Sequence, residues 1–447
     1  MPSRQQLPLP EPSCALGVRA CGDQGCRRHV RPVFDRPPES TPRTVTANST
    51  GSSATVNQNT GKEEARLKMS SPKVTFLHTV NNFAVVGLLI TPMVVSYWRG
   101  TWGLMDRYLL PQELVYSPWV SVGIGVPLLL MLNLLQSPLR RLAGRTDSCV
   151  VQHVCHVLYV YVHGFANVNH WRGVWKLLDV YTGINVTSVV VCAVLAVVLK
   201  AVMRTLYNTL APPILVATDF SSDPFTITTR FRTDSSSCSL RFALDALFTV
   251  GFIGSAVVLF WRGTWEMFDL FLFPGNAQLT ALSCLAIGFG LYLVQTVLQF
   301  PVMSLSRRLE RYLLLQVVLE DIFNLVSAVC AVSYWRGVWL TCDLLLLPDA
   351  PTLSLLVSHA VGTGVLYLAC AGRSVIVTGC VIDGEVGDGA GVRLGHYLKM
   401  DDLLSQYQPQ SPEDGEGPQG NQAQMDKVPG KTVNAAVADD MVQQSRL

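Results

Sequence analysis

The sequence predicts an all-α polytopic membrane protein in which eight transmembrane helices form four hairpins of the same orientation. Three observations lead to this fold class: apolar residues occur in long runs, one motif recurs four times, and basic residues alternate between successive loops. Hydrophobic residues make up 49% of the 447 residues and charged residues only 15%, compared with about 25% charged in ordinary globular domains. This balance indicates that lipid surrounds much of the chain.

Eight stretches are apolar and long enough to cross about 30 Å of hydrocarbon as helices. The expected spans are 75–97, 117–136, 149–169, 184–203, 240–260, 278–300, 312–334 and 351–371. The third and seventh spans carry the most polar residues. Together the spans define a transmembrane domain over 74–372.

The two ends of the chain have a different composition. Residues 1–73 are rich in Pro, Ser, Thr, Asn and Gln, and residues 409–424 are rich in Gly, Gln and acidic side chains. Such segments bury too little apolar surface to offset the entropy lost on ordering. We expect a disordered tail over 1–73 and a mostly disordered tail over 373–447, in which 374–399 fits either a short strand-like segment or a loop.

The motif Trp-Arg-Gly-x-Trp-x-x-x-Asp is the strongest feature of the sequence, and it contains eight of the nine tryptophans. A two-span hairpin that was duplicated twice accounts for four copies, and an even number of spans per copy keeps all copies in one orientation. The copies consist of Trp98, Arg99, Gly100, Trp102 and Asp106; Trp171, Arg172, Gly173, Trp175 and Asp179; Trp261, Arg262, Gly263, Trp265 and Asp269; and Trp335, Arg336, Gly337, Trp339 and Asp343.

Basic residues near the span ends predict the orientation. One side carries fifteen Lys and Arg residues between Lys62 and Arg311, whereas the other side carries six, of which four belong to the motif. Cytoplasmic loops carry the excess of Lys and Arg in membrane proteins. We therefore expect both tails to be cytoplasmic and all four motif loops to face the outside or a lumen.

The motif also suggests a local structure. Each motif glycine suits a helix C-terminal turn with positive φ. The following ten or so residues, closed by Pro111, Pro274 or Pro348, suit a short interfacial or re-entrant helix. Ile184 stands at the position of this proline in the second copy, so we expect a different loop there.

The charged residues of the motif can pair in two ways. Within one copy, Arg99 leans toward the helix N-terminus and away from Asp106, so pairing between neighbouring copies in a ring is the better geometry. A belt of aromatic anchors with arginines that reach the headgroups is the simplest alternative. A vestibule for a ligand or ion, and an outer face that binds a partner, are further alternatives.

Polar residues inside membrane spans are candidates for a functional pathway. One polar side chain precedes each motif by fifteen or sixteen positions, and in the seventh span an aspartate directly follows that side chain. The residues are Asn82, His156, Asp245, Glu320 and Asp321. These residues either line a pathway or reach toward headgroups and local arginines such as Arg241.

The third span and its end carry several histidines near one helix face, which resembles a metal or haem ligand set: His153, His156, His163 and His170. A metal site needs partners from other spans, where the sequence offers His78 and His359, and we expect no metal or cofactor. No nucleotide loop, serine hydrolase elbow or HExxH motif occurs, so we expect a non-enzymatic protein. The net charge of +2 gives no reason to expect a nucleic-acid partner.

The last three residues run from Ser445 to Leu447. A serine two residues before an apolar C-terminal residue fits a PDZ groove, in which backbone groups hold the carboxylate. The same tripeptide also resembles a peroxisomal address. On a protein with a cytoplasmic tail, the PDZ ligand is the better interpretation.

The four motif copies and the eight-span layout resemble the Fuseless family of animal membrane proteins. The resemblance covers roughly residues 74–372. It implies a presynaptic protein of the plasma membrane that supports neurotransmission by organising calcium channels. It implies no catalytic residues. A non-enzymatic scaffold is therefore the first functional hypothesis, and a transporter or channel for a small solute or ion is the alternative.

Overall fold

The computed structural model describes residues 72–146, 148–219, 225–235, 239–376, 379–395 and 397. The predicted N-terminal tail, except its last two residues, and the C-terminal residues Ser445 and Leu447 lie outside these residues. The described chain is helical, and its β pairing is one isolated bridge between Thr228 and Gly379. The prediction of an all-α fold is confirmed.

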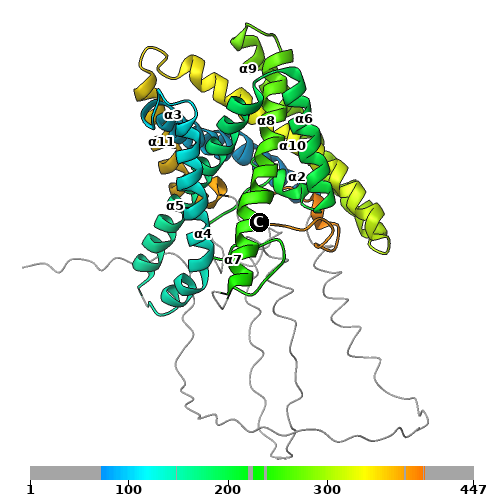
Figure 1. Ribbon diagram of the computed structural model, residues 1–447. Coiled ribbons are helices and arrows are strands. Elements are labelled where there is room, and N and C mark those ends of the chain that lie inside the picture. The colour runs from blue at the N-terminus through cyan, green and yellow to red at the C-terminus, as the bar shows by residue number, and fades with distance from the viewer. Residues whose placement is uncertain are drawn as a thin grey trace, which may run out of the picture. The chain divides into compact units, whose positions relative to one another are not determined.

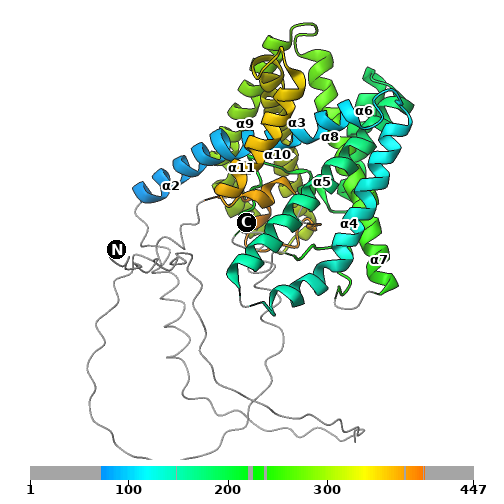
Figure 2. The ribbon, with the colours of Figure 1, turned by 90° about the vertical axis from the view of Figure 1, so that its left-hand side faces the viewer.

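Long helices follow the eight predicted spans; six of them extend beyond the predicted ends, whereas the helices at 186–202 and 351–368 are shorter than predicted. The first runs through α2 (Pro72–Val85), a π-helical stretch (Val86–Ile90) and α3 (Thr91–Tyr108); the fifth runs through α7 (Leu240–Leu247), a π-helical stretch (Phe248–Ile253) and α8 (Gly254–Phe271). The others are α4 (Tyr116–Ala143), α5 (Cys149–Thr182), α6 (Val186–Val202), α9 (Ala277–Leu309), α10 (Leu313–Leu345) and α11 (Pro351–Leu368). Figures 1 and 2 show these helices gathered into one bundle.

Six helices of the described chain are long and apolar enough to cross a membrane: Thr79–Tyr108, Tyr116–Ala143, Leu240–Phe271, Ala277–Leu309, Leu313–Leu345 and Pro351–Leu368. α6 is apolar but has 17 residues, and α5 is not among the six. The chain is therefore a multi-pass membrane protein by length and composition of its helices.

The helices pack in pairs that differ from the predicted hairpins. α4 packs along α5, α6 along α8, α9 along α10, and α11 along α3. We call the helix that follows each motif loop the returning helix of that copy. Each helix that bears the motif thus contacts the returning helix of the preceding copy, and the last returning helix contacts the first motif helix. The packed unit joins two successive copies because the small side chains that permit close approach lie on those two helices.

Two segments between or after the long helices also fold into the bundle. The first lies between α6 and α7 and contains the 3₁₀ turn Leu206–Thr209; the second follows α11 and contains the turns Gly372–Val375 and Ala390–Val392. Both contribute side chains to the core, namely Ile214, Val216, Phe225, Ile227, Val375, Val392 and Leu394. The folded domain therefore continues past the predicted boundary at 372, and residues 379–395 belong to it.

These two interior segments hold each other through a reciprocal pair of aspartates. The Asp383 carboxylate accepts hydrogen bonds of 2.6 and 3.0 Å from the first two backbone N–H groups of the turn Leu206–Thr209. Asp219 accepts two bonds of 2.9 Å from the same groups of the turn Gly372–Val375. A carboxylate at these N–H groups acts as a helix N-cap. Each interior segment thus caps a turn of the other.

Candidate functional site: the arginine–aspartate and tryptophan rings

All four copies of the motif are helical throughout, with the glycine in mid-helix and the aspartate in the last turn. The helices continue past the motif to Tyr108, Thr182, Phe271 and Leu345. The expectation of a glycine C-cap followed by a short interfacial helix is therefore wrong. Positive φ occurs instead four residues after each motif aspartate, where the outer loops begin, at Leu110, Gly183, Phe273 and Leu347.

The motif glycines allow two helices to approach closely, which is why they occur in mid-helix. A Cβ atom at Gly100 would lie 2.5 Å from the backbone nitrogen of His359 in α11, and one at Gly173 would lie 2.8 Å from that of Val122 in α4. Gly263 and Gly337 meet Ala193 and Leu285 in the same way. Small residues at such contacts are typical of tightly packed membrane helices.

The returning helices carry matching small residues one turn further along. A Cβ atom at Gly125 would lie 2.3 Å from the backbone nitrogen of His170, and one at Gly362 would lie 2.7 Å from that of Tyr97. Gly288 meets Tyr334 at 2.7 Å. Because both helices of these three pairs present small residues, the motif helix lies close enough to reach the polar side chains of its neighbour.

Each motif arginine binds the aspartate of the preceding copy, and the first arginine binds the last aspartate. The Nε atoms lie 2.7–2.8 Å from a carboxylate oxygen in the pairs Arg99–Asp343, Arg172–Asp106, Arg262–Asp179 and Arg336–Asp269. The four pairs form a closed ring of charges. The predicted pairing between neighbouring copies is confirmed, and the arginines do not extend freely toward headgroups.

In these pairs the arginine is the more buried partner. The side chain of Arg262 is 0% exposed and that of Asp179 is 17% exposed; for Arg99 and Asp343 the values are 5% and 44%. A buried guanidinium is stable only when its charge is paired and its remaining N–H groups are hydrogen-bonded.

Hydroxyl groups on the neighbouring returning helix provide those remaining hydrogen bonds. Arg172 donates to Ser121 and Ser117 at 2.6 and 2.9 Å, and Arg99 donates to Ser358 and Ser354 at 2.6 and 3.0 Å. In the third copy, Arg262 uses Ser188, Cys192 and the Gly183 carbonyl. The fourth arginine, Arg336, also lies over the ring of Trp265 at 5.1 Å.

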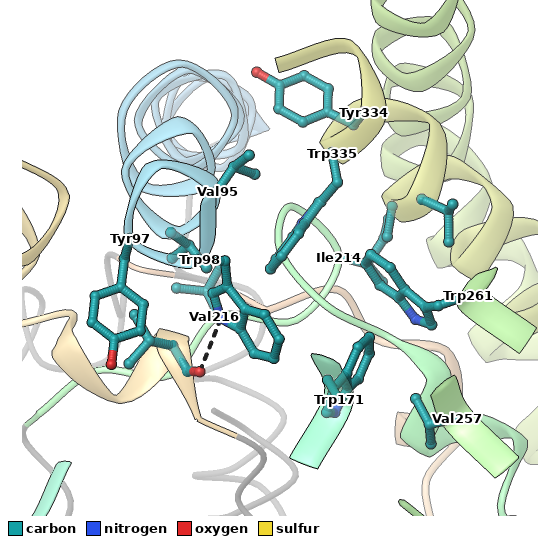
Figure 3. Close-up of a cluster of buried hydrophobic side chains, with 14 of the residues drawn as sticks. Val95, Tyr97, Trp98, Trp171, Ile214, Val216, Val257, Trp261, Tyr334 and Trp335 are labelled. Carbon is teal, nitrogen blue, oxygen red and sulfur yellow. Dashed lines mark hydrogen bonds between the residues drawn. The ribbon is translucent and has the colours of Figure 1, made fainter. Parts of the chain in front are cut away.

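The first tryptophans of the four copies form a closed ring of edge-to-face contacts, which we call the inner tryptophan ring. Neighbouring centroids are 5.1–5.7 Å apart around the cycle Trp98, Trp171, Trp261 and Trp335, with interplanar angles of 71–79°. Figure 3 shows these four indoles around one point. Such pairs each contribute about 0.5–1.5 kcal/mol beyond area burial.

The second tryptophans repeat this arrangement as the outer tryptophan ring. Its centroids are 5.6–6.3 Å apart around Trp102, Trp175, Trp265 and Trp339, and the planes are nearly perpendicular at 86–89°. In both tryptophan rings, each indole contacts the indoles on either side of it. The two rings therefore occupy the middle of the bundle at the level of the motif.

Three indoles of the inner ring are fixed by backbone carbonyls of the interior segments. Trp98 donates to Val375 at 3.2 Å, Trp261 to Thr209 at 2.9 Å and Trp335 to Pro212 at 2.7 Å. The interior segments thus contact the inner tryptophan ring on the side away from the outer tryptophan ring.

Asp245 is one of the candidate intramembrane residues, and it holds the first interior segment. Its carboxylate accepts hydrogen bonds from the hydroxyl groups of Thr229 and Thr233 at 2.7 and 2.8 Å, and from the backbone N–H of Phe231 at 3.0 Å. These partners are neither headgroups nor the local arginine that the sequence suggested.

The other candidate residues lie at separate contacts with the interior segments. Glu320 accepts a hydrogen bond of 2.5 Å from Ser306 and lies against Gly391, where a Cβ would be 2.3 Å from its carboxylate. Asp321 interacts with Asp383. His156 approaches Asp219 at 3.5 Å, and Asn82 is buried. The five residues do not converge on one pathway.

The histidines of α5 do not form a metal site with other described residues. His163 and His170 are buried, whereas His153 is exposed. His359 instead contacts the hydroxyl groups of Thr101 and Tyr161 at 2.9 and 3.2 Å. No group of three or more His, Cys, Asp or Glu side chains suited to a metal ion occurs in the described part of the chain.

A cavity of about 290 Å³ lies between the inner tryptophan ring and the interior segments. Its walls include the four inner indoles and residues of both segments, among them Tyr207, Arg232, Arg373 and Cys380. Burial raises the pKa of Cys380 to about 11 and that of Tyr207 to about 12, so both groups stay protonated at neutral pH. The cavity is therefore aromatic on one side, and its other side is mostly apolar with a few polar groups.

The sequence analysis did not find the polar residues that bind the arginines. In three copies they form a pair four residues apart near the start of the returning helix: Ser117 and Ser121, Ser188 and Cys192, and Ser354 and Ser358. Thr280 and Cys284 hold the same positions in the fourth returning helix, and the first member of each pair follows the motif aspartate by nine or eleven positions. Alignment of the four copies beyond the motif would have revealed this pattern, because a small hydroxyl or thiol recurs at both positions.

Comparisons with known proteins agree with the repeat. No curated protein and no solved structure matches the chain. The family model described as Fuseless matches residues 77–376, which include all four motif copies and the first 3₁₀ turn after α11. The chain therefore belongs to the Fuseless family.

Proposed function

We propose that this protein is a non-enzymatic membrane scaffold with eight spans, and that it supports synaptic transmission at presynaptic plasma membranes by organising calcium channels. The observation that carries the scaffold hypothesis is that the charged and aromatic side chains of the motif bind one another. Its arginines bind its own aspartates, and its indoles contact one another in two closed rings. The motif is thereby used to build a rigid bundle, which leaves loops and tails to bind partners.

The orientation with both tails in the cytoplasm is part of this proposal. Basic residues occupy the last turns of α4, α6 and α9, namely Arg140, Arg141, Lys200, Arg307 and Arg308. These turns lie at the opposite ends of the helices from the motif loops. The positive-inside rule then puts the interior segments on the cytoplasmic side. In this proposal α5 and α6, which correspond to the third and fourth predicted spans, also cross the membrane and bring the number of spans to eight.

The synaptic role can be tested by depletion and rescue in cultured neurons. Depletion should lower the density of presynaptic calcium channels and the calcium entry per action potential, and the full chain should restore both. A chain that lacks residues 398–447 separates the membrane core from the C-terminal tail, because the described fold ends before this segment. Unchanged channel density and unchanged evoked release after depletion would contradict the proposal.

The second candidate is a transporter or channel, and the cavity below the inner ring is the observation that favours it. If a solute passes through this cavity, Ala217→Leu, which narrows it, should abolish a flux into reconstituted vesicles without loss of protein in the membrane. On the scaffold hypothesis, the purified chain carries no flux.

A further inference from the structure

A smaller and mostly apolar recess lies beside the cavity below the inner tryptophan ring. The recess has a volume of about 60 Å³, and it shares Trp171, Asn208 and Val257 with the main cavity of about 290 Å³. An apolar cavity of roughly 150 Å³ is enough for benzene. The main cavity is therefore large enough for a molecule of two fused rings.

Two deeply buried polar groups line the recess and have no hydrogen-bond partner among the described residues. They are Nδ1 of His163 and Nδ2 of Asn167, whose residues are 2% and 4% exposed. Buried polar groups are almost always paired, and an unpaired one destabilises the fold. The amide nitrogen of Asn167 can only donate, so the recess lacks a hydrogen-bond acceptor.

Trp171, another residue that lines the recess, carries a second donor in its indole N–H. It is the one inner-ring indole for which the described residues provide no acceptor, whereas Trp98, Trp261 and Trp335 each bind a carbonyl. Trp171 lines both the cavity and the recess. A ligand that covers this indole would therefore place a polar end in the recess and an apolar body against the ring.

The charged side chains of the cavity favour an acidic ligand. Arg232, Arg373 and Glu385 are the Lys, Arg, Asp and Glu residues in its described lining, so the lining has an excess of positive charge. Arg373 is close enough to His163 for an electrostatic interaction. Arg232 and Glu385 form an ion pair with side chains 27% and 26% exposed, which marks the mouth of the cavity at the interior segments.

We propose that this cavity binds a small amphiphile with a flat apolar body and a carboxylate head. The body packs against the inner tryptophan ring, and the head accepts hydrogen bonds from Asn167 and Trp171. The ligand enters past the ion pair of Arg232 and Glu385. This inference goes beyond the scaffold function, and it does not require transport.

Three probes of one shape test the proposal on the full chain in lipid nanodiscs. 1-Naphthoate carries a carboxylate, 1-naphthamide a neutral acceptor, and naphthalene neither. Equilibrium dialysis against protein-free nanodiscs should give saturable binding, tightest for naphthoate and at least tenfold weaker for naphthalene. Naphthoate should also raise the Tm in a concentration-dependent way, because it binds the folded state. Absence of saturable binding to folded protein, or equal binding of all three probes, would overturn the proposal.

Variants of the lining separate the site from general partition into the bilayer. Ala217→Leu fills the main cavity and should abolish binding, whereas Ala201→Leu, on the exposed face of α6, should leave it unchanged. Asn167→Leu should weaken naphthoate at least tenfold and raise the Tm of the protein without probe. Wild-type affinity in both lining variants would refute the site, and a lower Tm in Asn167→Leu would show that the amide is already satisfied.

Discussion

Arg99 in the first copy of the motif donates a hydrogen bond of 2.8 Å to Asp343 in the fourth copy, 244 residues further along the chain. The other three pairs join consecutive copies, so this contact turns a row of repeats into a closed ring. α3 therefore completes its packing only when α11 has been added. Contacts of such long sequence separation form late, because the loop entropy must be overcome first.

The register of the ring can be tested by exchanging charges. Arg262→Asp leaves Asp179 facing a second carboxylate, and loss of one partner of a buried pair costs about 3–5 kcal/mol. The folded fraction, measured as the monodisperse peak in detergent chromatography, should fall sharply. Adding Asp179→Arg should restore part of that yield. The rescue stays incomplete because Ser188 and the Gly183 carbonyl are placed to accept from a guanidinium at position 262.

The control for this exchange is Asp269→Arg in the same Arg262→Asp background. Asp269 belongs to the same copy as Arg262 but pairs with Arg336, so this change should lower the yield further. Rescue by Asp269→Arg and none by Asp179→Arg would show that the charges pair within a copy.

The hydroxyl groups around the arginines should be replaceable by thiols but not by methyl groups. Ser358→Ala removes the 2.6 Å hydrogen bond to Arg99 and leaves a buried N–H unpaired, at a cost of about 1–3 kcal/mol. Ser358→Cys should stay closer to the wild type in a thermal-unfolding assay, because Cys192 holds the matching position beside Arg262 at 3.4 Å. If the alanine variant were as stable as the cysteine variant, the Ser358 hydroxyl group would not be needed to pair the Arg99 guanidinium.

The sequence was informative wherever a pattern repeated. The four motif copies sufficed to predict pairing between copies, because Arg and Asp recur at fixed spacing and helical side chains lean toward the N-terminus. The prediction of the local structure of the motif was wrong, because a glycine next to tryptophan residues suits a helix end as well as a close contact between helices. The element packed against the glycine distinguishes the two cases, and Gly100 contacts the backbone of α11.

The interior segments could not be predicted for a related reason. Residues such as Asp219 and Asp383 form no periodic pattern, and their partners lie on the other segment, more than 150 residues away in sequence. Asp245 and Glu320 were found as polar residues at a similar depth, but their contacts depend on these segments. Local composition therefore identified the residues and not their partners.

Labelling of single cysteines tests the proposed orientation. Leu114→Cys and Asp349→Cys lie in exposed outer loops, and Arg145→Cys and Tyr312→Cys lie at exposed positions near the opposite helix ends. In a background without reactive native cysteines, a membrane-impermeant maleimide applied to intact cells should label the first two. The last two should react only after permeabilisation. Labelling of Arg145→Cys on intact cells would invert the topology.

Two glycines in the same helix give the strictest test of the close helix contact. Gly362 in α11 faces α3, where a Cβ would lie 2.7 Å from the backbone nitrogen of Tyr97 and 2.7 Å from the carbonyl oxygen of Met93. Gly364, two residues later, has no atom within 4 Å of such a Cβ. Gly362→Ala should therefore push α11 away from α3, lengthen the bonds from Arg99 to Ser358, and lower the Tm by several degrees.

Gly364→Ala is the matched control, and it should be neutral or stabilising, since alanine is favoured over glycine in a helix by up to about 1 kcal/mol. The difference between the two variants isolates the contact from helix propensity. The contact also predicts an interaction between sites: in the Gly362→Ala background, Ser358→Ala should cost less than it does in the wild type, because the hydrogen bond is already weakened. Equal Tm values for the two glycine variants, or a full additive cost of Ser358→Ala, would mean that the arginine ring does not depend on the close approach of α3 and α11.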